Sequence, residues 1–170
     1  MNSVAFSPIG RILAISSSPP GESGVVWLWD VSDPARPAQL GQPLTSRDGG
    51  VGAVAFSPDR RTLALGLGVD SAVQLWDVSD PARPAQMGNL PTDDYGSVFD
   101  MAFSPDGHIL ATSNYEQDSV RLWDVSDPAR PAPLGHPSTN VKRSWASLAF
   151  SPDGHILAIG SQAVWLWAGG

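Results

Sequence analysis

The segment VRLWDVSDPARPA at residues 120–132 decides the fold of this chain. The phrase returns as VQLWDVSDPARPA at residues 73–85 and as VWLWDVSDPARPA at residues 26–38, and a truncated copy, VWLWA, occupies residues 164–168. An apolar run of strand length that ends in Asp and a proline-rich bend is typical of a β-strand followed by a turn. Four such strands at near-equal spacing predict a chain built of repeats.

A second phrase opens each repeat, as VAFSP at residues 4–8 and 54–58, MAFSP at 101–105 and LAFSP at 148–152. Its phenylalanines are 50, 47 and 47 residues apart, and the tryptophans that end the first phrase are 47, 47 and 44 apart. We predict a single domain over residues 1–170, with repeats at about 1–47, 48–93, 94–142 and 143–170. Because one aromatic type fills each position in every repeat, we interpret these side chains as structural packing residues: Phe6, Phe56, Phe103, Phe150, Trp29, Trp76, Trp123 and Trp167.

Each repeat predicts up to four strands, here named a to d in chain order. Strand a has a large–Ala–large pattern, which places Val and Phe on one face and Ala on the other. Ser-Pro-Asp-Gly then predicts a tight turn, in which Arg60 stands where glycine is expected and costs roughly 1 kcal/mol if its backbone is left-handed. Strand b is expected at 12–15, 62–65, 109–112 and 156–159, and strand c is the first phrase. Strand d is expected at 38–40, 85–87 and 132–134 and is missing from the fourth repeat.

The pattern VAFSPDG…LA…VRLWD resembles the WD-repeat β-propeller family over essentially the whole chain, and bacterial arrays with LWDVSDPARP linkers in particular. The resemblance implies an all-β propeller of four blades, each built a-b-c-d from the inside out, with the last blade lacking its outer strand. In that family such arrays often form the sensing or docking end of larger signalling proteins. The Gly-His pair of the family is missing near strand a, since its His positions hold Arg47, Asp94 and Val141. We therefore expect stability to rest mainly on apolar packing.

Four repeats raise the question of how the array closes. The family commonly has seven or eight blades, so four would sweep a partial or half ring and expose one blade face at each end. Three outcomes stay open. Two copies could form a homodimer that completes an eight-blade ring, the chain could close alone as a tight four-blade propeller, or it could be a fragment of a longer protein.

Composition excludes several kinds of partner and site. The net charge of −7 argues against nucleic-acid binding, which needs a basic surface. No apolar run approaches the ~20 residues of a membrane-spanning helix, and residues 1–20 lack the features of a signal peptide. We therefore expect no membrane and a cytoplasmic location. The chain has no cysteine, hence no disulfide and no thiolate metal site, and we expect no cofactor.

The two faces of the predicted disc differ in how much their loops vary. The a–b and c–d turns are nearly the same in every repeat, whereas the b–c and d–a loops on the opposite face vary in length and sequence. Variable loops on a repeated scaffold are where recognition usually resides, although unconstrained loops also drift. Charged and aromatic side chains gather in these loops, and the candidate partner-binding residues are Arg47, Asp93, Asp94, Tyr95, Tyr115, Glu116, Arg143 and Trp145.

Catalytic motifs are missing from the sequence, including a Ser-His-Asp arrangement, a glycine-rich phosphate loop and H-E-x-x-H. His108 and His155 follow the Asp-Gly turns, where we interpret them as solvent-facing residues and not as a metal pair. We predict a non-catalytic scaffold that binds a protein or peptide partner. The alternatives are a propeller enzyme or sugar-binding module with a central or inter-blade site, and a structural fragment of a longer propeller.

Overall fold

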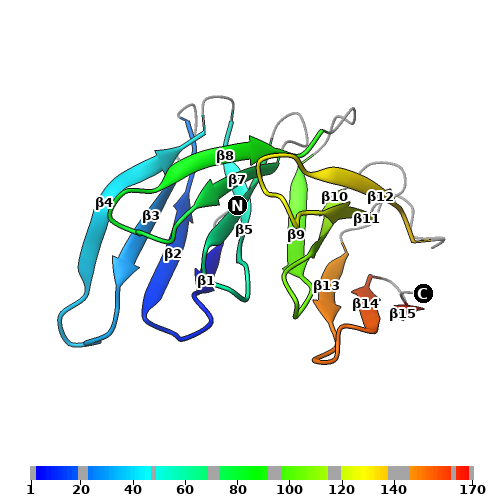
Figure 1. Cartoon of the computed structure of the whole chain (residues 1–170). Helices are drawn as coiled ribbons and strands as arrows, with labels where there is room; N and C mark the ends of the chain where they lie inside the picture. Colours follow the sequence, from blue (N-terminus) through cyan, green and yellow to red (C-terminus); the bar gives the residue numbers. More distant parts are fainter. Residues whose placement is uncertain are drawn as a thin grey trace.

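The computed structural model describes residues 3–18, 23–46, 49–68, 73–91, 97–114, 120–137, 146–161 and 164–168. These segments form fifteen β-strands and contain no helix. The strands make four antiparallel sheets that follow one another along the chain, with β1–β4 at one end of the array and β13–β15 at the other (Figure 1). The all-β class is confirmed, and we call the four sheets blades 1 to 4.

The strands recur in the same order in every blade. Blade 1 contains β1 (Val4–Phe6), β2 (Ile12–Ser17), β3 (Val25–Asp30) and β4 (Ala38–Thr45). Blade 2 contains β5 (Val51–Phe56), β6 (Thr62–Leu67), β7 (Val73–Asp77) and β8 (Ala85–Asn89). Blade 3 contains β9 (Val98–Phe103), β10 (Ile109–Asn114), β11 (Val120–Asp124) and β12 (Ala132–Gly135). Blade 4 has three strands, β13 (Ser147–Phe150), β14 (Ile156–Gly160) and β15 (Val164–Ala168), so the expected absence of its outer strand is confirmed.

Strand register brings the two repeated phrases together on one side of each sheet. In blade 1, Phe6 pairs with Leu13, and Leu13 pairs with Trp29. Directly paired residues point to the same side of a sheet, so this blade carries a Phe, Leu and Trp row on one face. The equivalent rows in blades 2, 3 and 4 are Phe56, Leu63 and Trp76, then Phe103, Leu110 and Trp123, then Phe150, Leu157 and Trp167.

The b strands run further than the sequence predicts. β2, β6 and β10 continue two residues past the expected ends, to Ser17, Leu67 and Asn114. Most of the added residues pair with the beginning of strand c, as Ser113 does with Val120, whereas Leu67 and Asn114 pair with strand a. Because Ser, Gly and Asn are poor strand formers, cross-strand pairing and not residue type extends these strands.

The Ser-Pro turns between strands a and b are held by the same hydrogen bonds in each blade. In blade 3 the Gly107 N–H donates to Ser104 O at 2.9 Å, and the Ile109 N–H donates to Ser104 Oγ at 2.9 Å. Gly107 has φ +78°, and Arg60, at the same position in blade 2, has φ +68°. Arg60 therefore has the left-handed backbone whose cost the sequence analysis gave conditionally.

Each blade packs through two chemically different faces. We call the face that contacts the preceding blade its N-side face, and the face that contacts the following blade its C-side face. Between blades 1 and 2, the C-side residues Ala14, Val26 and Leu28 form one buried cluster with the N-side residues Leu63 and Leu65. Equivalent clusters join blade 2 to blade 3 and blade 3 to blade 4. The N-side face carries the Phe, Leu and Trp row, and the C-side face carries small Ala residues with Val and Leu of strand c.

The inner strands of neighbouring blades also contact one another, since β5 touches β1 and β9, and β9 touches β13. This close approach requires small residues. A Cβ atom on Gly66 would lie 2.6 Å from Val98 Cγ1 of the next blade. Blades 1 and 4 lie at opposite ends of the array, so the four blades form a partial ring that leaves both ends open (Figure 1).

Candidate functional site

The b–c and d–a loops lie together on one face of the array, which we call the loop face. Gly24, in the b–c loop of blade 1, donates its N–H to Gly49 O at 2.9 Å and accepts the Ser46 N–H at 3.0 Å. Gly68, in the b–c loop of blade 2, donates its N–H to Gly50 O at 2.7 Å. The loop that joins blades 1 and 2 is therefore tied by backbone hydrogen bonds to the b–c loops of both blades.

Side-chain hydroxyls anchor the bases of these loops across blade boundaries. The Val51 N–H donates to Ser18 Oγ at 2.9 Å, and Ser97 Oγ donates to Gly68 O at 2.6 Å. Between blades 3 and 4, the buried Ser113 Oγ donates to Ala146 O at 2.7 Å. The loop face thus rests on a base in which each blade is bonded to the next.

The predicted partner-binding residues belong, by sequence, to the b–c and d–a loops. All eight fall outside the described residues, so the structure does not place Arg47, Asp93, Asp94, Tyr95, Tyr115, Glu116, Arg143 or Trp145. The described residues on either side of them belong to the loop face. Ser46 and Gly49 flank the first loop, and Ser97 and Ala146 follow the second and the last.

Asp100 is a half-buried carboxylate on the inner strand of blade 3 that the sequence analysis missed. Its Oδ1 accepts the Met101 N–H at 2.9 Å, and its Oδ2 accepts the Leu148 N–H of the next blade at 2.8 Å. Burial raises the pKa of Asp100, and the two backbone N–H donors oppose that rise. The equivalent Ser3 accepts the Val54 N–H at 3.3 Å, so this position links neighbouring inner strands.

The opposite face carries the a–b and c–d turns, and we call it the turn face. The Val125 N–H of a c–d turn donates to His108 O of the a–b turn at 2.8 Å, and His108 Nδ1 lies 2.9 Å from Ser126 Oγ. The guanidinium Nε of Arg130 lies 3.3 Å from Asp127 Oδ2, three residues earlier in the chain. The c–d turn has the same sequence, VSDPARPA, in blades 1 to 3, so the turn face is nearly the same in these blades.

Hydrogen bonds from nearby serines lower the pKa of two carboxyl groups on the turn face. The Ser32 hydroxyl and N–H lower the pKa of Asp30, and the Ser126 N–H and hydroxyl lower the pKa of Asp124. Within the described segments, no group of three or more His, Cys, Asp or Glu side chains is placed to hold a metal ion.

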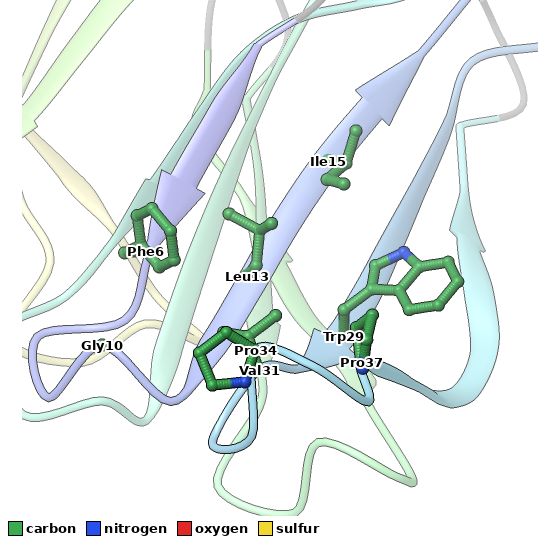
Figure 2. Close-up of a pocket in the computed structure, with 8 residues that line it drawn as sticks. All are labelled: Phe6, Gly10, Leu13, Ile15, Trp29, Val31, Pro34 and Pro37. Carbon is green, nitrogen blue, oxygen red and sulfur yellow. The ribbon is translucent and has the colours of Figure 1, made fainter.

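A groove of about 560 Å³ crosses the open N-side face of blade 1. Figure 2 shows Phe6, Leu13 and Trp29 side by side on β1, β2 and β3, with Pro34 below Leu13 and Pro37 below Trp29. The side chains that line the groove are all apolar, and the Phe6 side chain is 62% exposed. We call this surface the N-end face.

The open C-side face of blade 4 is also apolar. Val164 is 75% exposed and Leu166 is 69% exposed, and Ile156 beside them on β14 is exposed as well. Leu166 pairs with Ala158, as Leu28 pairs with Ala14 in blade 1. We call this surface the C-end face.

No helix in the described parts of the chain has both the length and the apolar character needed to cross a bilayer. A search of curated protein sequences gives no significant match. Among solved structures, the periplasmic gluconolactonase PpgL of Pseudomonas aeruginosa is similar in fold, with a TM-score of 0.75 and 18% sequence identity. The alignment covers 98% of this chain and 52% of that one, so this chain spans about half the length of the gluconolactonase chain.

Two segments, residues 40–77 and 87–124, match the family described as "WD domain, G-beta repeat". Each begins within the outer strand of one blade, β4 or β8, and ends with strand c of the next blade, at Asp77 or Asp124. A family repeat therefore crosses a blade boundary and ties two neighbouring blades covalently. From these matches and the four-sheet array, we conclude that the chain contains WD repeats, matched at residues 40–77 and 87–124, and folds as an open array of four β-propeller blades.

Proposed function

We propose that this chain is a non-catalytic interaction scaffold that binds a protein or peptide partner through its loop face. The observation that carries the proposal is the difference between the two faces. The turn face repeats one set of turns from blade to blade, whereas the loop face displays loops of different length and sequence above hydrogen bonds that cross each blade boundary. Diverse loops on a uniform scaffold are the usual arrangement of a recognition surface.

The anchors support this proposal because they limit the entropy that binding must remove. Ser18, Ser97 and Ser113 fasten the loop bases across blade boundaries. A loop whose base is held in place loses less conformational freedom when a partner docks than a loop whose base is free. Aromatic and arginine side chains within a charged surround would then supply the central contacts, as in many protein interfaces.

The test first selects peptide ligands and then identifies which face of the chain binds them. Peptides are selected from a phage-displayed random library on the immobilised chain, and their dissociation constants are measured for substituted chains. Joint substitution of Asp93, Asp94 and Tyr95 with alanine, and of Arg143 and Trp145 with alanine, is expected to weaken binding at least tenfold. The matched control is alanine at Arg36, Arg83 and Arg130 on the turn face, which should leave binding unchanged. Peptides that bind both loop-face variants at full strength, or that lose binding in the control, would contradict the proposal.

A catalytic function is the second candidate, and the similarity to a gluconolactonase fold favours its being tested. Among the described residues of the inner strands, the one carboxylate is Asp100, and both of its oxygens already accept backbone N–H groups. A carboxylate held in this way is better suited to joining blades than to activating water. Hydrolysis of glucono-δ-lactone above the uncatalysed rate, lost on Asp100→Asn, would favour the enzyme instead.

A further inference from the structure

Equivalent positions on the C-side faces show one consistent difference between blades. Val26, Val73 and Val120 are at most 1% exposed because the following blade covers them, whereas Val164 of blade 4 is 75% exposed. The residue type is the same at all four positions, so the difference comes from the missing neighbour. Blade 4 therefore has the same apolar C-side face as the other blades, but no described residue covers it.

The N-side faces show the same difference at the other end of the array. Leu63, Leu110 and Leu157 are fully buried against the preceding blade. Leu13, their equivalent in blade 1, lies in the open groove beside the exposed Phe6 (Figure 2). The N-end and C-end faces are thus the two halves of an interface that the chain already forms three times internally.

We propose that these two faces bind each other between copies of the chain. The C-end face of one copy packs against the N-end face of a second copy. The C-end face of the second copy packs in the same way against the N-end face of the first, and the two chains form a closed ring of eight blades. The contact is heterologous, but a two-fold axis satisfies both faces of both chains and leaves no open end. This inference does not depend on the proposed function of the loop face.

Continuity with the internal blade interfaces identifies a second copy as the occupant. The N-end face offers the Phe, Leu and Trp row, and what covers that row in every other blade is the Ala, Val and Leu surface that the C-end face presents. The groove lining has no charged side chain that would select an ionic ligand.

Side-chain hydrogen bonds between inner strands at two of the three internal boundaries predict a specific contact across the new interface; the equivalent residue in blade 2, Ala53, has no side-chain acceptor. Ser3 Oγ accepts the Val54 N–H at 3.3 Å, and Asp100 Oδ2 accepts the Leu148 N–H at 2.8 Å. Ser147 occupies the same strand position in blade 4, and it is exposed. The equivalent contact is then Ser147 Oγ accepting the Val4 N–H of the second copy.

The first measurement is molar mass in solution by light scattering. The unsubstituted chain is expected at twice the 17.9 kDa of one chain. Leu166→Glu and Phe6→Glu, each of which places a charge on one end face, should both give the mass of a single folded chain. The matched control is Leu134→Glu, because Leu134 is 54% exposed on the outer strand β12, away from both end faces. This control should keep the paired mass.

Mixing the two variants tests whether unlike faces meet. A pair made of one Phe6→Glu chain and one Leu166→Glu chain keeps one unaltered interface, so an equal mixture should regain the paired mass. If like faces met instead, one of the two variants would still pair on its own, which would overturn the proposal.

A cysteine trap keeps the test independent of variants that fail to fold. The natural chain has no cysteine, so Val4→Cys with Ser147→Cys adds the only two thiols. Oxidation should link two chains on a non-reducing gel, while Val4→Cys with Leu134→Cys should not. A single-chain mass for the unsubstituted chain at every concentration, or masses that grow beyond two chains, would show that no closed pair forms.

Discussion

Leu63 and Leu13 hold the same position in consecutive blades, yet Leu63 is fully buried and Leu13 borders an open groove. The two blades share their strand order, register and turn bonds, so nothing within the sheet accounts for the difference. What differs is the number of neighbours. Burial in this molecule is therefore a property of the array, and a blade supplies two half-interfaces that become core only when another blade covers them.

The difference in burial between covered and open faces corresponds to a free energy that is large compared with the net stability of a typical domain. Fully burying a Val or Leu side chain contributes roughly 1.5–3 kcal/mol. Interior blades gain this on two faces and end blades on one. Matched substitutions at covered and open positions can measure the difference directly, in a chain that also carries Leu166→Glu so that the end faces stay open.

The largest effect is expected from truncating the leucine of the Phe, Leu and Trp row. Leu110→Ala removes a fully buried side chain between blades 2 and 3 and should cost about 2–5 kcal/mol in the free energy of unfolding. Leu13→Ala at the open position should cost less than about 1 kcal/mol, because no blade loses contacts there. Urea titration of both variants gives the comparison. Equal losses would mean that the N-side face of blade 1 is packed like the interior faces.

A glycine pair tests the same difference by adding an atom. Gly66→Ala places its Cβ 2.6 Å from Val98 Cγ1 across a covered boundary and should cost about 1–3 kcal/mol. Gly160 occupies the same position in blade 4, where the nearest atom would be Ser147 O at 3.8 Å. Gly160→Ala should be neutral or slightly stabilising, since it restricts the unfolded chain without a clash. Thermal unfolding that shows Gly66→Ala to be harmless would contradict the close approach of blades 2 and 3.

The tryptophans extend the comparison to a polar contact. Trp123 is almost fully buried, and its Nε1–H donates to Thr112 Oγ1 at 3.0 Å. Trp123→Phe leaves that hydroxyl without its donor and should cost about 1.5 kcal/mol in the free energy of unfolding. Trp29→Phe, in the open groove, should cost under about 0.5 kcal/mol. The measurement is the midpoint of urea unfolding, and a larger loss at Trp29 would reverse the expected order.

The a–b turns should not depend on neighbours, because their strain is local. Gly10 and Gly107 both have positive φ, in an end blade and an interior blade, and an added Cβ would clash at neither position. Alanine at either site should cost about 1 kcal/mol, the same in both blades. Arg60→Gly, which relieves a left-handed non-glycine residue, should raise stability by a similar amount. A cost at Gly107 well above that at Gly10 would show that the turn also serves the blade interface.

Acid sensitivity gives the smallest expected effect. The pKa values of Asp30 and Asp124 are lowered by the serines two residues on, so the folded chain favours their ionised forms. Their contribution is present above the unfolded pKa of about 3.8 and is lost as pH falls through the lower folded value. Asn at either position should flatten the fall in the unfolding midpoint below pH 4 to the same small extent in both blades. A flattening at only one of the two positions would contradict a local origin.

The contribution of Asp100 to stability changes with pH in the opposite direction, because burial raises the pKa of its carboxyl group in the folded chain. Its protonated form is the one that the fold favours, so its contribution is fully present below pH 3.8 and declines as pH rises through the folded value. Asp100→Asn should therefore make the chain more sensitive to acid, not less. The same urea titrations between pH 3 and pH 7 measure both effects.

The strand order and the paired faces could be predicted because repetition made the weak signals of short strands consistent with one another. The ends of the b strands could not, since Ser16 and Ser17 join β2 through pairing with Val26 and Val25 and not through any β-propensity of their own. The role of Asp100 was also hidden. It is one carboxylate in an apolar strand, and its partner Leu148 is 48 residues away.

For the loop face, the residue pattern predicts the side on which the loops lie but not the hydrogen bonds that hold them. The side on which each loop lies could be predicted, because antiparallel strands alternate in direction and place the b–c and d–a loops on the same side. Comparison of the repeats then showed that these loops are the variable ones. The anchors across blade boundaries, such as Ser113 to Ala146, join residues that share no local motif. Geometry of this kind follows from how blades stack and has no signature in a single repeat.

One pair of faces serves every boundary between blades, and this has a consequence for how such a gene can change. Duplication or loss of a whole 47-residue repeat leaves each new junction with the same two complementary surfaces. Blade number can then vary in evolution without the invention of a single new contact. What selection must then tune is the small rotation between adjacent sheets, because that angle decides which number of units meets end to end.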